Sequence, residues 1–131
     1  MIEQTELVIS KWSYHPPVKS IEEAGEKLNS SITLEIMKKK AATKKGIACR
    51  FNIEFVFEKE IILQYVAEDS YVIDPEDAID MPELRIMIRN SYSKFKEKFE
   101  LRKLGTVLAN KSLLPFDETK YDLEPALRLL Q

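Results

Sequence analysis

The chain has 131 residues, 44% of them hydrophobic and 32% charged, and its 20 basic and 22 acidic side chains give a net charge of −2. This composition is typical of one folded domain and excludes a disordered chain. The near balance of charge argues against a nucleic-acid binder, and no segment reaches the length of a membrane span. We therefore expect a single domain over residues 1–131.

The cysteine content points to a reducing compartment. Cys49 is the only cysteine, so an internal disulfide is excluded. The first residues include acids and no long apolar run, which is not typical of a signal peptide, and we expect a cytoplasmic protein. Cys49 falls on the apolar face of a predicted strand, which predicts a buried, inert thiol rather than a nucleophile.

The first predicted strand covers residues 5–14. It ends at His15-Pro16-Pro17, because proline cannot donate to a sheet ladder. Ser20 then begins a capping-box pattern, which predicts a short helix or turn up to Asn29. Period-two alternation assigns the strand's side chains to two faces: Val8, Ser10, Trp12 and Tyr14 on one, and Leu7, Ile9 and Lys11 on the other.

A second strand is predicted over residues 31–38, where apolar and polar side chains alternate. The lysine-rich stretch 38–45 follows. We interpret it as a solvated turn between strands, since so short a loop would supply only weak, salt-sensitive phosphate contacts.

The strongest pattern lies between residues 46 and 73. Apolar side chains recur at every second position from Cys49 to Phe57, and a second extended arm runs from Ile61 to Val66. The charged residues 58–60 between the arms predict a turn, although without Gly or Asn its type stays open. We expect a long antiparallel hairpin at the centre of a sheet, with the second arm continuing to Ile73.

A long helix is predicted to begin near Met81-Pro82-Glu83 and to stop near Gly105. One apolar stripe runs along it at spacings of three and four, formed by Leu84, Ile88, Tyr92, Phe95 and Phe99. Ile86 and Met87 lie off this stripe and suggest a second contact surface, such as a subunit interface.

The last part of the chain contains an apolar, proline-containing extended segment near residues 111–116 and a final helix from about residue 123 to 130. The chain has more large apolar residues than its core requires. They either pack under the sheet or at a subunit interface, or they line a groove for extended apolar polypeptide. The candidates for polypeptide binding are Trp12, Tyr14, Phe57, Leu113, Leu114 and Phe116.

Catalytic and metal-binding signatures are missing from the sequence. His15 is the only histidine, which argues against a histidine-based metal site or triad. Three glycines cannot build a phosphate-cradling loop. We expect a protein that is not an enzyme and has no cofactor and no bound metal.

The order of elements resembles the SecB family of export chaperones: four antiparallel strands, a long helix, a proline-containing extended segment and a short final helix. The residues that carry the resemblance are Met81-Pro82-Glu83-Leu84 at the start of the helix and Tyr14-His15-Pro16-Pro17 at the end of the first strand. Ser112-Leu113-Leu114-Pro115-Phe116, followed by residues 121–127, is similar to the family's apolar run before its last helix. The resemblance implies an α+β fold.

The same resemblance implies an ATP-independent chaperone, assembled as a homodimer or homotetramer, that holds non-native polypeptide during protein export. Glu35 and Glu54 would then lie on a sheet face that docks a translocation motor. This chain lacks the family's glycine-rich stretch before the helix, which weighs against motor docking. The alternatives are a relative dedicated to one partner, as in a toxin–antitoxin pair, and a small oligomeric interaction or structural protein without chaperone activity.

Overall fold

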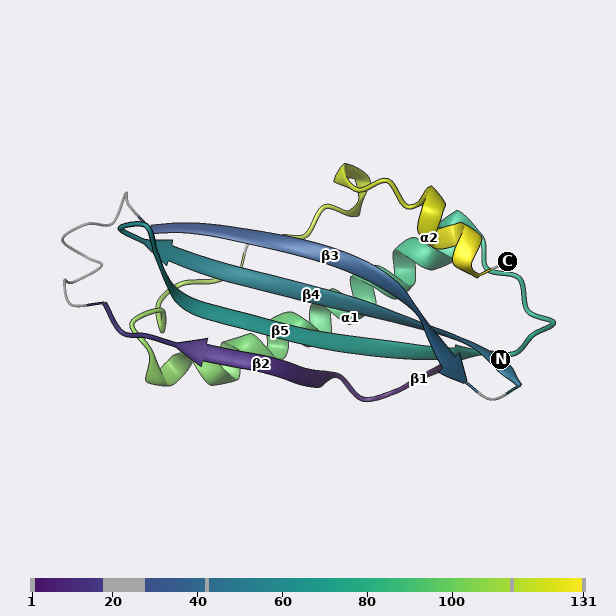
Figure 1. Cartoon of the computed structure of the whole chain (residues 1–131), viewed down its shortest axis with the longest axis horizontal. Helices are drawn as coiled ribbons and strands as arrows, with labels where there is room; N and C mark the ends of the chain where they lie inside the picture. The colour runs from purple at the N-terminus through teal and green to yellow at the C-terminus, as the bar shows by residue number, and fades with distance from the viewer. Residues whose placement is uncertain (1, 18–27, 42, 114, 131) are drawn as a thin grey trace.

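The computed structural model describes residues 2–17, 28–41, 43–113 and 115–130. These residues form an α+β fold in which one antiparallel sheet is covered on one face by a long helix (Figure 1). In chain order the elements are β1 (Ile2–Gln4), β2 (Val8–Tyr14), β3 (Leu28–Ala41), β4 (Lys44–Phe57), β5 (Glu60–Ile73), α1 (Met81–Arg102), the 3₁₀ turns η2 (Lys103–Gly105) and η3 (Glu118–Lys120), and α2 (Glu124–Leu129).

The sheet has five strands, not the four that the sequence predicted. Strands β3, β4 and β5 pair in sequence order, and both β1 and β2 pair with the other side of β5. The predicted first strand, residues 5–14, begins only at Val8. Residues 5–7 lie between β1 and β2, where the Thr5 amide and hydroxyl donate to the Ser70 carbonyl at 2.9 and 3.2 Å. The sheet therefore ends in β3 at one edge and in β1 and β2 at the other (Figure 1).

The predicted faces of the first strand were partly wrong, because the strand contains a bulge. Its register with β5 shifts between Ile9 and Lys11. An extra residue in one strand reverses the alternation beyond it. As a result Ile9 and Trp12 both pack on the core, while Val8 is 63% exposed.

The central hairpin is confirmed. Strand β4 pairs with β5 from Lys45↔Ile73 to Phe57↔Glu60, and β5 continues without a break to Ile73. The turn residues Glu58 and Lys59 have φ values of 50° and 68°. Two successive positive φ angles match the turn that suits the right-handed twist of a hairpin, here formed without glycine or asparagine.

Strand β3 is longer than predicted at both ends. The predicted helix or turn up to Asn29 is wrong at its last two residues, which already pair with β4; the remainder, 20–27, lies outside the described residues. The lysine-rich stretch does join two strands, but most of it is strand rather than turn, because residues 38–41 and 44–45 belong to the paired strands. Lysines on strand ends and edges are a common way to discourage further strand pairing.

Helix α1 begins and packs as predicted. The Asp80 side chain caps it by accepting a hydrogen bond from the Glu83 amide at 2.9 Å. All five residues of the predicted stripe are buried, and so is Met87, which the sequence placed off the stripe; Ile86 is 52% exposed. An α-helix that lies across a wide sheet buries a band of side chains broader than one narrow stripe.

Aromatic rings fill the layer between α1 and the sheet. The Tyr65 ring stacks on the Phe95 ring with centroids 4.2 Å apart, and the Tyr65 hydroxyl donates to the Phe95 carbonyl at 3.0 Å. The Phe55 ring stacks on the Phe99 ring at 5.8 Å. These contacts fix α1 on the two central strands.

We predict that Phe95→Ala lowers the free energy of unfolding by about 3–5 kcal/mol, because it leaves a cavity under a fully buried ring. Glu97→Ala, at an exposed position on the same helix, should change it by less than about 0.5 kcal/mol. Urea denaturation followed by circular dichroism measures both, and equal losses in the two variants would contradict the assigned helix orientation.

Candidate functional site

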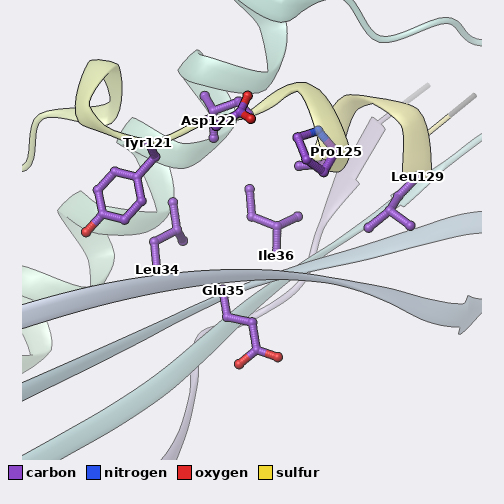
Figure 2. A pocket seen from close by; sticks show the side chains of 9 residues that line it. Leu34, Glu35, Ile36, Tyr121, Asp122, Pro125 and Leu129 are labelled. Atoms are coloured by element: carbon purple, nitrogen blue, oxygen red, sulfur yellow. The ribbon is translucent and has the colours of Figure 1, made fainter.

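A groove of about 360 Å³ lies between β3 and the C-terminal segment of the chain (Figure 2). One wall comes from β3 and the other from residues 121–129. In Figure 2 the side chains of Leu34 and Ile36 point up toward the C-terminal segment, whereas Glu35 points to the other side of the sheet. The lining residues are Leu34, Glu35, Ile36, Tyr121, Asp122, Leu123, Pro125, Ala126 and Leu129.

The position of the groove follows from β3 being an edge strand. Among the described residues β3 pairs only with β4, so every second backbone amide and carbonyl points outward. The Ile32 carbonyl is one of these outward groups, because it accepts a hydrogen bond from the Tyr121 hydroxyl at 3.2 Å. Leu34 and Ile36 lie two and four residues beyond Ile32 on the strand, so their backbone amides and carbonyls also point outward. Their side chains line the groove.

The C-terminal wall is held by three buried residues of its own, Leu123, Ala126 and Leu130. Pro125 lies in the first turn of α2, where the missing amide costs no helix hydrogen bond. This anchoring leaves Leu129 41% exposed at the groove. The sequence predicted α2 itself, but Leu129, Leu34 and Ile36 were not among the predicted site residues, and Glu35 was predicted for partner docking rather than for polypeptide binding.

Trp12 and Tyr14 lie on β2, at the opposite edge of the sheet from this groove. The Trp12 ring meets the Tyr65 ring edge-on at 5.4 Å, and the Arg102 guanidinium lies 5.7 Å from its centroid. The Tyr14 hydroxyl accepts from the Val107 amide at 3.0 Å. Both side chains are partly buried and pack on the core near the end of α1.

The remaining predicted polypeptide-binding residues lie elsewhere. Phe57 and Leu113 are buried, with 3% and 4% exposure, and so present no surface in this conformation. Phe116 is partly buried among aromatic rings, and Leu114 lies outside the described residues. The described members of the predicted polypeptide-binding set therefore lie in separate places, and none of them lines the groove.

Glu35 and Glu54 lie on the sheet face away from α1, in a mixed rather than acidic environment. Glu35 is 3.7 Å from the Arg50 guanidinium, whose Nε also donates to Glu68 at 3.0 Å. The Glu54 carboxylate accepts from the Gln64 amide at 3.2 Å. Basic and amide groups thus accompany both acids on this face.

A buried polar cluster, which the sequence did not reveal, joins α1 to β5 and β1. Asp69 is fully buried; its carboxylate accepts from the Ser91 hydroxyl at 2.7 Å and lies 3.3 Å from the Lys94 ammonium. The Tyr71 hydroxyl lies 2.6 Å from Ser91 Oγ and accepts from the Gln4 amide at 2.9 Å. Burial of the Asp69 carboxylate is tolerated because it has several polar partners, and the Gln4 hydrogen bond holds β1 on the core.

Cys49 is fully buried on the core face of β4, as the strand pattern predicted. Burial raises the pKa of its thiol to about 12. The thiolate is the reactive form, so at pH 8 the folded protein holds Cys49 in the unreactive form.

We predict that a thiol reagent such as DTNB at pH 8 labels the folded protein at least about a hundredfold more slowly than the urea-unfolded chain, whose thiol has a pKa near 8.5. Absorbance of the released thionitrobenzoate measures both rates. Equal rates would show that the thiol is accessible and not buried.

Within the described residues, no helix is long and apolar enough to cross a membrane. In the same residues, no three His, Cys, Asp or Glu side chains gather closely enough to hold a metal ion.

The fold defines the chain as an α+β protein with a SecB-like arrangement of sheet and helices. Its fold matches a SecB-like chaperone of Mycobacterium tuberculosis, solved in complex with a ChAD peptide from the HigA1 antitoxin; the TM-score is 0.58 at 11% identity, over 88% of this chain and 90% of that chain. A protein of unknown function from Streptococcus agalactiae has a TM-score of 0.49 at 12% identity, over 89% of this chain and 97% of that chain. No protein-family model and no curated protein sequence matches the chain.

Proposed function

We propose that this protein binds extended, non-native polypeptide segments in the groove between β3 and residues 121–129. The observation that carries the proposal is the coincidence of an apolar groove with an unpaired strand edge. An extended peptide beside β3 could pair with the outward backbone groups of Leu34 and Ile36 and place alternate side chains in the groove. Backbone pairing gives affinity for any sequence, and the apolar lining selects segments that a folded client would bury.

In this proposal the protein is not an enzyme, and it holds clients by equilibrium binding without ATP. The peptide-bound SecB-like chaperone with the same fold supports a polypeptide ligand. We further propose a cytoplasmic homodimer or homotetramer that serves protein export. Motor docking through Glu35 and Glu54 has less support, because Arg50 and Lys39 share their sheet face.

A dedicated partner is the second candidate function. The peptide bound to the M. tuberculosis chaperone comes from one antitoxin, so the same fold serves a defined partner there. A dedicated module would bind one polypeptide tightly and leave unrelated unfolded proteins unaffected.

We predict that a several-fold excess of the purified protein suppresses the aggregation of a chemically unfolded test protein, measured by light scattering. Leu129→Asp should weaken client binding about tenfold, because losing about 1.5 kcal/mol of apolar contact changes Kd by that factor. Ile61→Asp is the matched control, since Ile61 is similarly exposed at 46% and lies outside the groove. Unchanged aggregation with the wild-type protein would contradict the chaperone function.

We predict a solution mass of two or four times the 15.2 kDa of one chain, measured by light scattering after size-exclusion chromatography. Exposed apolar side chains on α1 and η2, namely Ile86, Leu101 and Leu104, provide surface for such an assembly. A strict monomer at all concentrations would contradict the assembly but not the peptide groove.

A further inference from the structure

Part of the chain between η2 and α2 already lies against β3. We call its described residues, 111–113 and 115–121, the strap; it includes the 3₁₀ turn η3. The Phe116 ring packs against the rings of both Phe51 and Tyr92, with centroids 5.4 and 5.2 Å away, and stacks on the Tyr121 ring at 5.1 Å. Leu113, Phe116 and Tyr121 are thus the apolar side chains by which this otherwise polar segment packs on the chain's own core.

Leu113 of the strap covers one end of β3. It borders a small cavity of about 50 Å³ that is lined by residues 30–32 of β3 and by Phe55 and Tyr92. Farther along β3, Tyr121 bonds the Ile32 carbonyl, and the open groove over Leu34 and Ile36 begins there. The covered and open parts therefore form one track along residues 30–36, about 20 Å long at about 3.3 Å per residue.

Polar contacts hold the strap at three places. At its start the Lys103 ammonium donates to the Lys111 carbonyl at 2.6 Å. In the middle Arg89 Nε donates to the Glu118 carboxylate at 2.7 Å, and the guanidinium lowers the pKa of that buried acid. At its end Tyr121 bonds Ile32.

Between these places the strap is not part of the sheet. Within the described part of the chain, residues 112, 113, 115 and 116 have no backbone–backbone hydrogen bond to one another or to other described residues. Packing of the Leu113 and Phe116 side chains holds this stretch, so it can leave without breaking a strand ladder.

We propose that the strap is an internal occupant of the polypeptide site, which a bound client displaces, and that the Arg89–Glu118 pair is the latch that keeps it in place. This inference rests on the proposed function and adds the regulation of the same site. When the strap leaves, the track along β3 opens from Ile36 back to Ser30, and the Phe116 socket accepts a client side chain. A client must compete with a segment tethered at high effective concentration, so the latch lowers client affinity.

The test uses a fluorescently labelled peptide with the sequence of residues 111–121 and the Arg89→Ala variant of the full chain. Arg89 is exposed on α1 and lines neither cavity, so its removal leaves the groove intact and leaves Glu118 buried without its partner. We expect Arg89→Ala to bind the peptide at least about tenfold more tightly than wild type by fluorescence anisotropy. Trypsin should also cleave the variant faster after Lys111 and Lys120.

Two control variants isolate the latch. Lys98→Ala removes a cation of α1 that lies beside Glu6 and Leu7 rather than the strap, and it should behave as wild type. The exchange Arg89→Glu with Glu118→Arg restores opposite charges and should return peptide affinity and trypsin resistance toward wild type. Circular dichroism confirms that each variant is folded, and Glu118→Gln provides a second way to weaken the latch if Arg89→Ala does not fold.

Equal peptide affinity in wild type, Arg89→Ala and Glu118→Gln would overturn the inference, as would absence of peptide binding in all of them. If wild type suppresses aggregation but the latch variants bind the peptide no more tightly than wild type, the strap is not a displaceable occupant and the proposed function stands. If the latch variants bind the peptide but none of the proteins suppresses aggregation, the displaceable strap stands and the chaperone function fails.

Discussion

The packing of aromatic rings between α1 and the two central strands is the contact on which the rest of this structure depends. Tyr65, Phe95 and Phe99 lock the helix across β4 and β5, and the Tyr65 hydroxyl bonds the helix backbone itself. With both central strands and one face committed to this layer, the sheet keeps only its edges and its outer face for other partners. Both the groove and the strap lie at one of those edges.

The two edges of the sheet are closed in different ways. At the β5 side, β1 and β2 complete the sheet, and the Asp69 cluster ties Gln4 to α1. At the β3 side no further strand is paired within the described residues, and the edge is instead approached by the strap and by α2. An exposed strand edge invites pairing with other chains, and the strap and α2 protect this edge. In the proposed mechanism a bound client displaces the strap.

The likeness to a SecB-like chaperone at 11% identity illustrates how loosely sequence determines this fold. What the fold requires is a long hairpin with one apolar face and a helix with a matching apolar band, which many side-chain combinations satisfy. The binding site makes different demands, because it depends on which apolar residues remain at an edge after the core is filled. Function must therefore be argued from the groove of this chain rather than from the fold.

The sequence by itself determined the elements whose pattern is local: the β4–β5 hairpin, the start and buried stripe of α1, the position of α2 and the burial of Cys49. Only the tertiary structure decided the bulge in β2, the Asp69 cluster and the separation of the predicted binding residues from one another. Alternation tells which side chains share a face. It does not tell whether Phe57 is buried by other elements, or whether Trp12 and Phe116 lie in the same groove. Those outcomes depend on contacts between residues far apart in the chain, and no local pattern encodes them.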